Sequence, residues 1–266
     1  MASFGTLLVP LSMLVTPGPT PAPAHTGRIE QITDQIASRQ SVTPVWVVVV
    51  TGLMAFVVGG GFVVVDWMTT ATHEGAHVVA GSAMGQLQGV IIPPKHSKEM
   101  PHTKAVLDGP FRWFLGMFVG YLGPSLFGLL GAFLLSRDHV EATLWSAIAL
   151  LVGLLGITKN PFGVFVVLLL AGGLLAVAWS DAPGLHTVVA YLLVWSLLWA
   201  GIQDVLKQGS AAARKADAAA RKAKAKQVSD HMALRNKTLV PRFIWVLVHL
   251  VLGIGAFYLG ARLMLF

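Results

Sequence analysis

The chain has 266 residues, of which 55% are hydrophobic and only 12% are charged, and its mean hydropathy is +0.71. Several apolar runs approach the roughly 20 residues that a helix needs to cross a bilayer, so we expect a multi-pass membrane protein. The formal charge is +7, but ten of the 19 lysines and arginines lie between Lys207 and Arg242. This clustering indicates membrane orientation and argues against nucleic-acid binding. With no cysteine, the chain has neither a disulfide framework nor a thiolate metal ligand.

The apolar runs predict an all-α, polytopic membrane bundle of about seven spans, preceded by a Pro-rich and polar N-terminal extension at residues 1–41. From Pro44 to Met84 the apolar run is too long for one crossing, and Gly59–Gly61 is the expected turn between two helices. The expected spans are 42–58, 62–84, 111–135, 140–157, 161–179, 185–205 and 243–265. Residues 42–206 would form the membrane core, and residues 243–266 the C-terminal transmembrane helix.

Residues 207–242 form a basic loop between the last two expected spans. Because positively charged loops favour the cytoplasmic side, we expect this loop to be cytoplasmic and the protein to be a multi-pass protein of the cell membrane. The Ala- and Lys-rich part of the loop, 211–227, is typical of a solvated helix that touches anionic lipid.

Residues 85–110 interrupt the apolar pattern between the second and third expected spans. Gln88–Ile92 and Thr103–Leu107 are short strand-like runs on either side of a polar tip, which predicts a β-hairpin. Such a hairpin offers an edge to an extended peptide, since strand addition uses main-chain hydrogen bonds. His96 and His102 near the tip are better interpreted as exposed loop histidines than as metal ligands, because neither has a helical partner four residues on.

The segment Thr72–His77, with the sequence THEGAH, lies inside the expected helix 62–84. On a helix, His73 and His77 project about 40° apart and lie about 6 Å apart along the axis, so both imidazoles face one side. This is the spacing of a two-histidine metal clamp, and Glu74 is placed to take a proton from a metal-bound water. The pattern predicts a metallohydrolase. Asp66 shares this face but lies about 10.5 Å from His73 along the axis, so we expect it to support the site or line a water path.

Two alternatives to a metal site are a chance match and a structural role. With 9 histidines and 4 glutamates in the chain, composition alone predicts about 0.005 HExxH matches. Ionisable side chains near the middle of a membrane helix cost roughly 2.5–3.5 kcal/mol on insertion scales, so they need partners. A metal is one such partner. Hydrogen bonds to neighbouring helices, within a structural polar cluster, are the other.

Five segments, taken in order, are more specific than any one alone. They are THEGAHVVAG (72–81), GYLGPSLFG (120–128), TKNPFGVFVV (158–167), HTVVAYLLVWSLLWAG (186–201) and SDHMALRNKTLVPRFIW (229–245). From about Pro44 to Phe266 the chain resembles the site-2 protease family of zinc intramembrane metalloproteases, in particular its compact bacterial branch found in actinobacteria. The resemblance implies that His73 and His77 bind zinc and that Glu74 is the general base. The branch usually has HEGGH, whereas this chain has Ala76 in place of the second glycine.

The third metal ligand departs from the family pattern. Better-known site-2 proteases supply it as an aspartate in an NxxPxxxxDG segment; here Asn160 starts a similar segment, but the residue eight positions on is Leu168. Asp108 belongs to an LDG sequence in a loop, and we interpret it as a decoy. Asp230, in the SDxxxLxxxT stretch, is the favoured candidate, and Asp204, near the cytoplasmic end of the sixth span, is the runner-up. Asn160 is itself a candidate for positioning the scissile peptide or its oxyanion.

These observations predict a zinc-dependent endopeptidase that cuts a membrane-anchored protein in or near a transmembrane segment. Zn is the expected cofactor, and the partners are the substrate and the lipid bilayer, with no nucleic acid. The alternative is a non-catalytic membrane scaffold or assembly factor that keeps the fold and has lost the third ligand. A third ligand near His73 and His77 is the feature that separates the two hypotheses.

Overall fold

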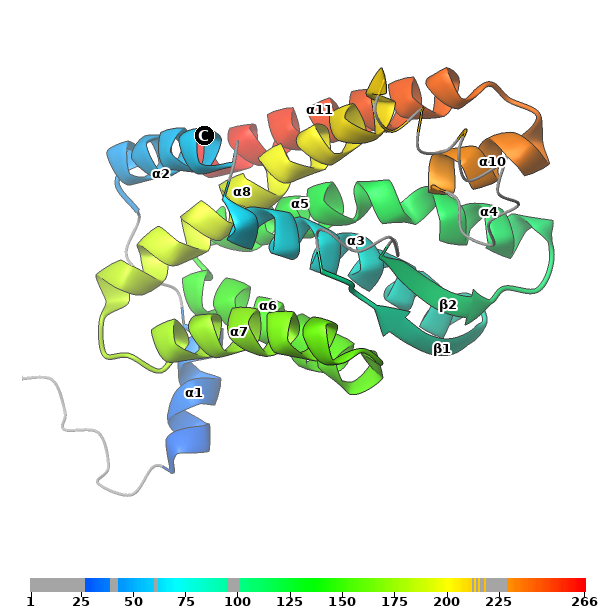
Figure 1. Ribbon diagram of the computed structural model, residues 1–266. Helices are drawn as coiled ribbons and strands as arrows, with labels where there is room; N and C mark the ends of the chain where they lie inside the picture. The colour runs from blue at the N-terminus through cyan, green and yellow to red at the C-terminus, as the bar shows by residue number, and fades with distance from the viewer. Residues whose placement is uncertain are drawn as a thin grey trace, which may run out of the picture.

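The computed structural model describes residues 27–38, 43–59, 62–94, 101–211, 213, 215, 218 and 229–266. Over these residues the protein is a helical bundle with one small antiparallel β-hairpin, so the expected all-α membrane fold is confirmed (Figure 1). The Pro-rich N-terminal stretch, the Gly60–Gly61 part of the expected turn, the hairpin tip with His96, and most of the Ala- and Lys-rich segment lie outside the described residues.

The elements follow the predicted order. Before and within the hairpin they are α1 (Arg28–Ala37), α2 (Val45–Val58), α3 (Val63–Met84), β1 (Gln86–Ile91) and β2 (His102–Val106). After the hairpin they are α4 (Pro110–Val119), the 3₁₀ turn η2 (Gly120–Leu122), α5 (Gly123–Leu135), α6 (Val140–Ile157), α7 (Pro161–Ala178), α8 (Pro183–Gly209), α10 (Asp230–Thr238) and α11 (Arg242–Leu265). Helices α4, α5, α7 and α8 each carry proline in the first turn, where its missing N–H has no intrahelical partner to lose.

Fewer stretches than expected have the length and composition of a membrane span. Among the described residues, five stretches are long and apolar enough to span a bilayer: Pro110–Leu135, α6, α7, α8 and α11. Helices α2 and α3 pass the same test only as a pair, and they are bent by 96° relative to each other, so the total is five or six rather than about seven. Length is the reason for α2, which has 14 residues, about 21 Å of helix against roughly 30 Å of hydrocarbon. Helix α3 is long enough, with 22 residues, but its polar residues lower its hydropathy.

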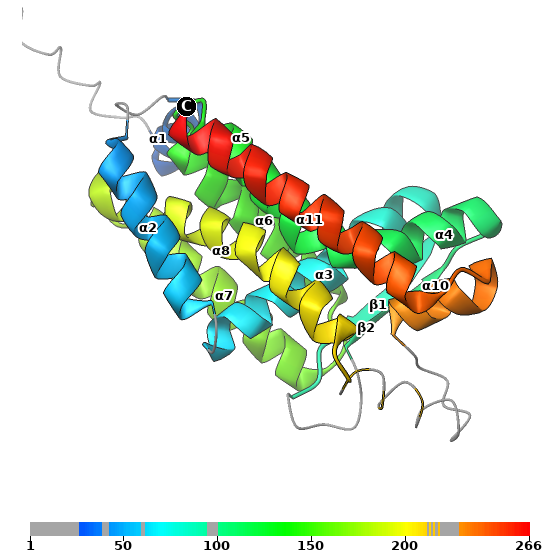
Figure 2. The same cartoon turned by 90° about the horizontal axis from the view of Figure 1, so that it is seen from above.

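Helix α8 runs through the middle of the bundle. Figures 1 and 2 show α2 and α11 along one side of α8, with α6 and α7 on the other side and α5 packed along it. Trp195 and Leu198 of α8 are buried in the main hydrophobic core, and the Trp195 indole N–H donates to the Val48 carbonyl of α2 at 3.0 Å. A Cβ on Gly128 of α5 would lie only 2.9 Å from Leu198 Cγ. Small residues of this kind let membrane helices approach closely.

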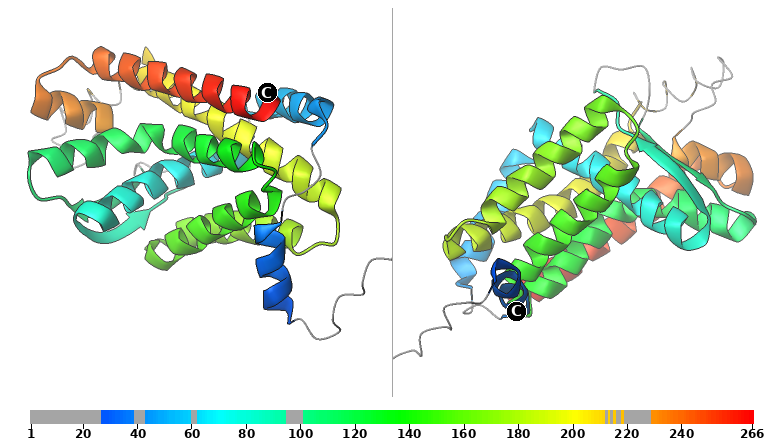
Figure 3. Two further views of the ribbon diagram at one scale, coloured as in Figure 1. Left: turned by 180° about the vertical axis from the view of Figure 1, so that it is seen from behind. Right: turned by 90° about the horizontal axis from the view of Figure 1, so that it is seen from below.

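The hairpin is fastened to the bundle along β1. Val90 lies opposite Thr103 of β2, with a register irregularity between Leu87 and Gly89. On the other edge of β1, the Lys159 N–H donates to the Val90 carbonyl at 2.8 Å, just before α7 begins. Figure 3 shows the hairpin beside the connection between α6 and α7. The hairpin therefore has a fixed position against the membrane helices.

A polar cluster lies at the ends of α6 and α7 that are farthest from the hairpin. Nδ1 of His186 lies 2.5 Å from Oε1 of Glu141, and its Nε2 lies 3.1 Å from Oγ of Ser180. His186 and Glu141 are both buried. The contacts join the start of α6, the end of α7 and the start of α8, so the pair stabilises the helix ends farthest from the hairpin.

Replacing Gly128 with alanine should destabilise the bundle, because the new methyl group would push α5 away from α8. We expect a loss of about 1–3 kcal/mol, the usual cost of overpacking a tight contact. The matched control is Gly172→Ala in α7, where a Cβ meets no atom within 4 Å. Helix propensity predicts equal or slightly higher stability for that variant. Thermal loss of helical circular dichroism in detergent measures both; equal midpoints would contradict the packing argument.

Candidate metal centre

The HExxH motif lies on helix α3, the helix that the sequence predicts for it. Glu74 and His77 are buried, and the side chain of His73 is 15% exposed. The rings of His73 and His77 lie 5.0 Å apart between centroids, as expected for positions one helical turn apart. Hydroxyls of this apolar helix bond to its own backbone; Thr69, for example, donates to the Val65 carbonyl. The histidines and the glutamate, like Asp66 nearer the start of the helix, therefore have their partners on other elements.

Asp230, the first residue of α10, meets both histidines. Its Oδ2 atom lies 3.1 Å from Nε2 of His73 and 3.0 Å from Nε2 of His77. Within the described part of the chain, these three side chains form the one group of three or more His, Cys, Asp or Glu residues whose ligand atoms all fall within 4.8 Å of one another. The structure thus brings together the motif pair and the favoured third candidate.

Each histidine is held through its other ring nitrogen. Nδ1 of His77 donates to the Gly116 carbonyl at 2.7 Å, and Nδ1 of His73 donates to Oδ2 of Asp204 at 3.2 Å. In the neutral tautomer with its proton on Nδ1, each ring directs the lone pair of Nε2 toward the side of the site where Asp230 lies, as a metal-binding histidine does. Asp204, the runner-up ligand, therefore lies behind His73, in the position from which carboxylates commonly orient metal-binding histidines.

Asp230 is ionised, as a carboxylate that binds a metal ion must be. Burial by itself raises the pKa of this carboxyl, but His77 and His73, when protonated, outweigh that effect through their positive charge and their hydrogen bonds and hold the pKa below its usual range. Two imidazole nitrogens and one carboxylate oxygen make the three-ligand set of several catalytic zinc sites, which keep a fourth position for water or substrate. The donor set at this site fits zinc.

Gly120 of η2 leaves room above the histidines. A Cβ at this position would lie 2.3 Å from Nε2 of His77 and 2.9 Å from Nε2 of His73. Gly123 has a related role, since a Cβ there would come within 2.5 Å of the Thr72 carbonyl. Gly120 thus keeps side-chain atoms away from both metal-facing nitrogens, and Gly123 lets the start of α5 pack closely against α3.

Glu74 points toward the hairpin. The Thr103 hydroxyl of β2 donates to Oε2 of Glu74 at 2.8 Å and lies 3.3 Å from the Glu74 carbonyl oxygen. Glu74 is adjacent in sequence to His73 but does not belong to the ligand group. Its carboxylate is therefore oriented by the same hairpin that flanks the site.

The Asn160 side chain is engaged with β1. Its Nδ2 donates to the Ile92 carbonyl at 2.6 Å, and its Oδ1 accepts from the Ile92 N–H at 2.9 Å. The amide thus bonds the main chain just beyond β1 as a neighbouring strand would. These two bonds fix the amide against β1 and use one of its two N–H donors, so Asn160 supports the position of β1 and keeps a second N–H.

The remaining acidic and histidine candidates lie elsewhere. Asp108 is exposed and outside the ligand group. Asp66 pairs with Lys207 of α8, with Nζ and Oδ1 2.7 Å apart. His102, in β2, is also outside the ligand group. Asp66 therefore ties α3 to the end of α8.

Sequence reasoning missed several residues around the site. Thr103, Tyr121, His231 and His249 all contact the motif residues or one another within the described structure. One signal was available for His249, because an ionisable residue in an otherwise apolar span is by default a candidate functional residue. Burial and the neighbouring His249 lower the pKa of His231 to about 3, so its ring is neutral.

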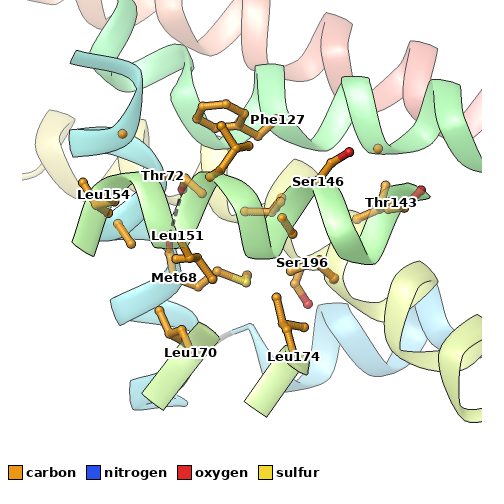
Figure 4. Close-up of a pocket in the computed structure, with 18 of the residues that line it drawn as sticks. Met68, Thr72, Phe127, Thr143, Ser146, Leu151, Leu154, Leu170, Leu174 and Ser196 are labelled. Atoms are coloured by element: carbon orange, nitrogen blue, oxygen red, sulfur yellow. Dashed lines mark hydrogen bonds between the residues drawn. The ribbon is translucent and has the colours of Figure 1, made fainter. Parts of the chain in front are cut away.

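A separate apolar cavity of about 740 Å³ lies between α3 and the helices α5, α6, α7 and α8. Figure 4 shows the side chains that line it, among them Met68, Thr72, Phe127, Leu151, Leu154, Leu170 and Leu174. His73 and His77 point about 100° and 140° around the helix from Thr72, so the cavity and the histidines occupy different faces of α3. The cavity is therefore distinct from the ligand group.

These features define a multi-pass membrane protein with a partly buried cluster of metal-ligating residue types at one end of its helical bundle. A family model described as Peptidase M50B-like matches residues 45–260. The chain therefore belongs to the site-2 protease family, a family of peptidases, and the resemblance seen in the sequence is confirmed. No curated protein and no solved structure matches the chain.

Replacing Gly120 with alanine should abolish metal binding without removing any ligand, since the methyl group would occupy the space beside both Nε2 atoms. The matched control is Gly156→Ala in α6, where a Cβ has no neighbour within 4 Å. Metal content of the detergent-purified variants, measured by mass spectrometry, tests this. A metal-loaded Gly120→Ala protein with unchanged stoichiometry would contradict the assignment of this space.

Proposed function

We propose that the protein is a zinc-dependent intramembrane endopeptidase that hydrolyses a peptide bond in or near a transmembrane segment of another membrane protein. The observation that carries the proposal is the meeting of His73, His77 and Asp230 beside Glu74. Membership of a peptidase family supports the reaction class. The apolar spans support a substrate that is itself anchored in the bilayer.

In this proposal His73, His77 and Asp230 bind the zinc ion. A zinc ion in such a site supplies Lewis acidity that makes water a nucleophile near neutral pH. Asp204 keeps the proton of His73 on Nδ1, and the Gly116 carbonyl does the same for His77, so that both Nε2 lone pairs face the site.

Glu74 acts as the general base. It lies next to the ligand group without belonging to it, so its carboxylate is available to accept a proton from the attacking water and to deliver it to the leaving amine. The hydrogen bond from Thr103 fixes Oε2, which leaves Oε1 for the proton. The base is thereby oriented before a substrate arrives.

The substrate segment would have to be extended at the site, and the hairpin suits that requirement. The outward edge of β1 already bonds to Lys159 and Asn160, so an added strand would use the edge of β2. Asn160 would then position the substrate indirectly, by holding β1. The basic 207–242 loop would face the cytoplasm of a plasma-membrane protein.

The alternative, a non-catalytic scaffold, rested on the missing aspartate after Asn160. The proximity of the Asp230 carboxylate to both histidines weakens that reason, because a third donor of the right chemistry is available. A zinc-free protein with an intact fold would restore the scaffold hypothesis.

The first test is the metal content of the detergent-purified protein beside a variant carrying both His73→Ala and His77→Ala. We expect about one zinc per chain in the wild type and none in the double variant, because two of three ligands are removed. Helical circular dichroism serves as the folding control. Zinc-free wild-type protein, purified without chelators, would remove the basis of the proposed activity.

The substitution Glu74→Gln should abolish cleavage while zinc remains bound, because the amide keeps the shape of the side chain but cannot accept the proton. The assay is cleavage of a panel of single-span reporter proteins in reconstituted vesicles, scored by gel mobility and terminal sequencing. Retained turnover in this variant would rule out Glu74 as the base.

Asp230→Asn and Asp204→Asn should separate a ligand from a residue that orients a ligand. We expect zinc affinity to fall by about 10–100-fold for Asp204→Asn, the usual effect of removing a partner behind a metal-binding histidine, and by more for Asp230→Asn. Competition with a fluorescent zinc chelator measures both affinities. The reverse order would make Asp204 the ligand.

A further inference from the structure

We propose that His249 and Tyr121 are positioning residues that hold Asp230 against the two motif histidines, acting through His231. This inference rests on the proposed metal site and names the residues that keep its third candidate ligand, Asp230, in place. Asp230 is the first residue of α10, a helix of nine residues that is not among the membrane-crossing stretches. Its carboxylate meets His73 and His77 only if α10 is docked in one position.

His231 is the residue through which α10 is docked next to Asp230. Its side chain is fully buried, with 0% of its surface exposed. Its ring stacks on Tyr121, with centroids 3.9 Å apart and planes 12° apart. Because His231 directly follows Asp230 in the chain, a fixed ring at this position also fixes the backbone from which the Asp230 carboxylate projects.

Tyr121 contacts both sides of the site. Besides stacking on His231, its ring meets His73 edge-on, with centroids 4.7 Å apart and planes 83° apart. Tyr121 is buried and directly follows Gly120, the glycine that keeps space open beside the histidines. One ring therefore sets the spacing between the helix that carries His73 and the helix that carries Asp230.

His249 links α10 to α4 from inside the last membrane span. Its Nε2 lies 2.9 Å from the Phe118 carbonyl oxygen, and its Nδ1 lies 3.3 Å from Nε2 of His231. The same Nδ1 lies 2.8 Å from the Trp245 carbonyl oxygen, one turn earlier in α11. In the tautomer with its proton on Nε2, His249 donates to Phe118 and accepts from the Nε2–H of His231. In the tautomer with its proton on Nδ1 it donates to Trp245 instead, and the contact with His231 is the edge-on packing of the two rings, with centroids 5.0 Å apart.

Burial of an ionisable residue such as His249 inside a membrane span costs free energy unless the residue has polar partners. The residue is fully buried in α11, a stretch with the length and composition of a membrane span. Ionisable residues in such spans are rare and are by default candidates for functional sites, with their partners in the bundle interior. Here the partners are His231 and a backbone carbonyl of α4, and the chain of contacts ends at Asp230.

Other contacts of α10 hold the helix without acting at Asp230. Leu234 is fully buried, and the Lys237 ammonium lies 4.3 Å from the ring centroid of Trp113 in α4. These contacts lie one to two turns farther along α10. The His231 contacts are the ones adjacent to Asp230, so their loss should affect the metal site before it affects the fold.

The test compares His249→Asn with His249→Gln, two amides that replace different ring nitrogens. Asparagine places an amide near the Nδ1 position and can still accept from His231, whereas glutamine reaches the Nε2 position and keeps the bond to Phe118. We expect His249→Gln to lower zinc affinity by about 10–100-fold, the range for residues that orient metal ligands, and His249→Asn to stay closer to the wild type. The opposite order would overturn action through His231.

A double-variant cycle separates positioning from a general structural role. In an Asp230→Ala background, His249→Gln should not lower the zinc affinity of the remaining two-histidine site any further, because the residue through which it acts is gone. An equal fold-loss in both backgrounds would overturn the proposal. Chelator competition gives all four affinities, and circular dichroism confirms that each variant is folded.

A metal-independent readout uses the absence of cysteine from the chain. Leu234→Cys puts a thiol on the buried side of α10, and Asn236→Cys puts one on its exposed side as the control. Adding His249→Gln should speed maleimide labelling of the thiol at 234 and leave that at 236 unchanged. Unchanged protection at 234 would overturn the proposal. If the wild type binds no zinc, the proposed function fails, yet this labelling still decides whether His249 docks α10.

Discussion

The cluster of His73, His77 and Asp230 depends on an interruption in the membrane span Pro110–Leu135. Helix α4 ends at Val119 and α5 begins at Gly123, with a 3₁₀ turn between them. The last four carbonyls of an α-helix have no intrahelical partner, and two of them in α4, those of Gly116 and Phe118, accept hydrogen bonds from His77 and His249. The turn also places Gly120 beside the histidines.

A second constraint is that polar groups inside an apolar bundle must be paired. At the hairpin end, the described ionisable groups near the site bond to one another, to Thr103 and to free helix carbonyls. At the far end, Glu141 and His186 pair with each other. In a low-dielectric interior such networks are strongly favoured when complete and costly when broken. The site is accordingly assembled from side chains on several helices, most of them held by a specific partner; the buried Nδ1 of His231 has none in the described structure.

The sequence predicted the fold class and the hairpin well, because periodic apolar runs and a polar interruption are local patterns. The structure has five or six candidate spans against the expected seven or so, since composition does not reveal that α2 is short and sharply bent against α3. Asp230 and Asp204 could be named as candidates but not assigned, because sequence does not tell which carboxylate faces Nε2 of His73 and which faces its Nδ1. Tyr121 and Thr103 gave no signal at all, since their roles arise from contacts between distant segments.

By itself, the sequence determined the spacing of His73, Glu74 and His77, because an α-helix puts residues four apart on one face whatever surrounds it. It also determined that the surroundings are apolar and helical. Only the tertiary structure decided which residue is the third member of the candidate metal site, since Asp230 is separated from His73 and His77 by 157 and 153 positions. No local rule relates residues that far apart. Their meeting depends on how α3, α8, α10 and α11 pack around the interrupted span, and packing is a property of the whole bundle.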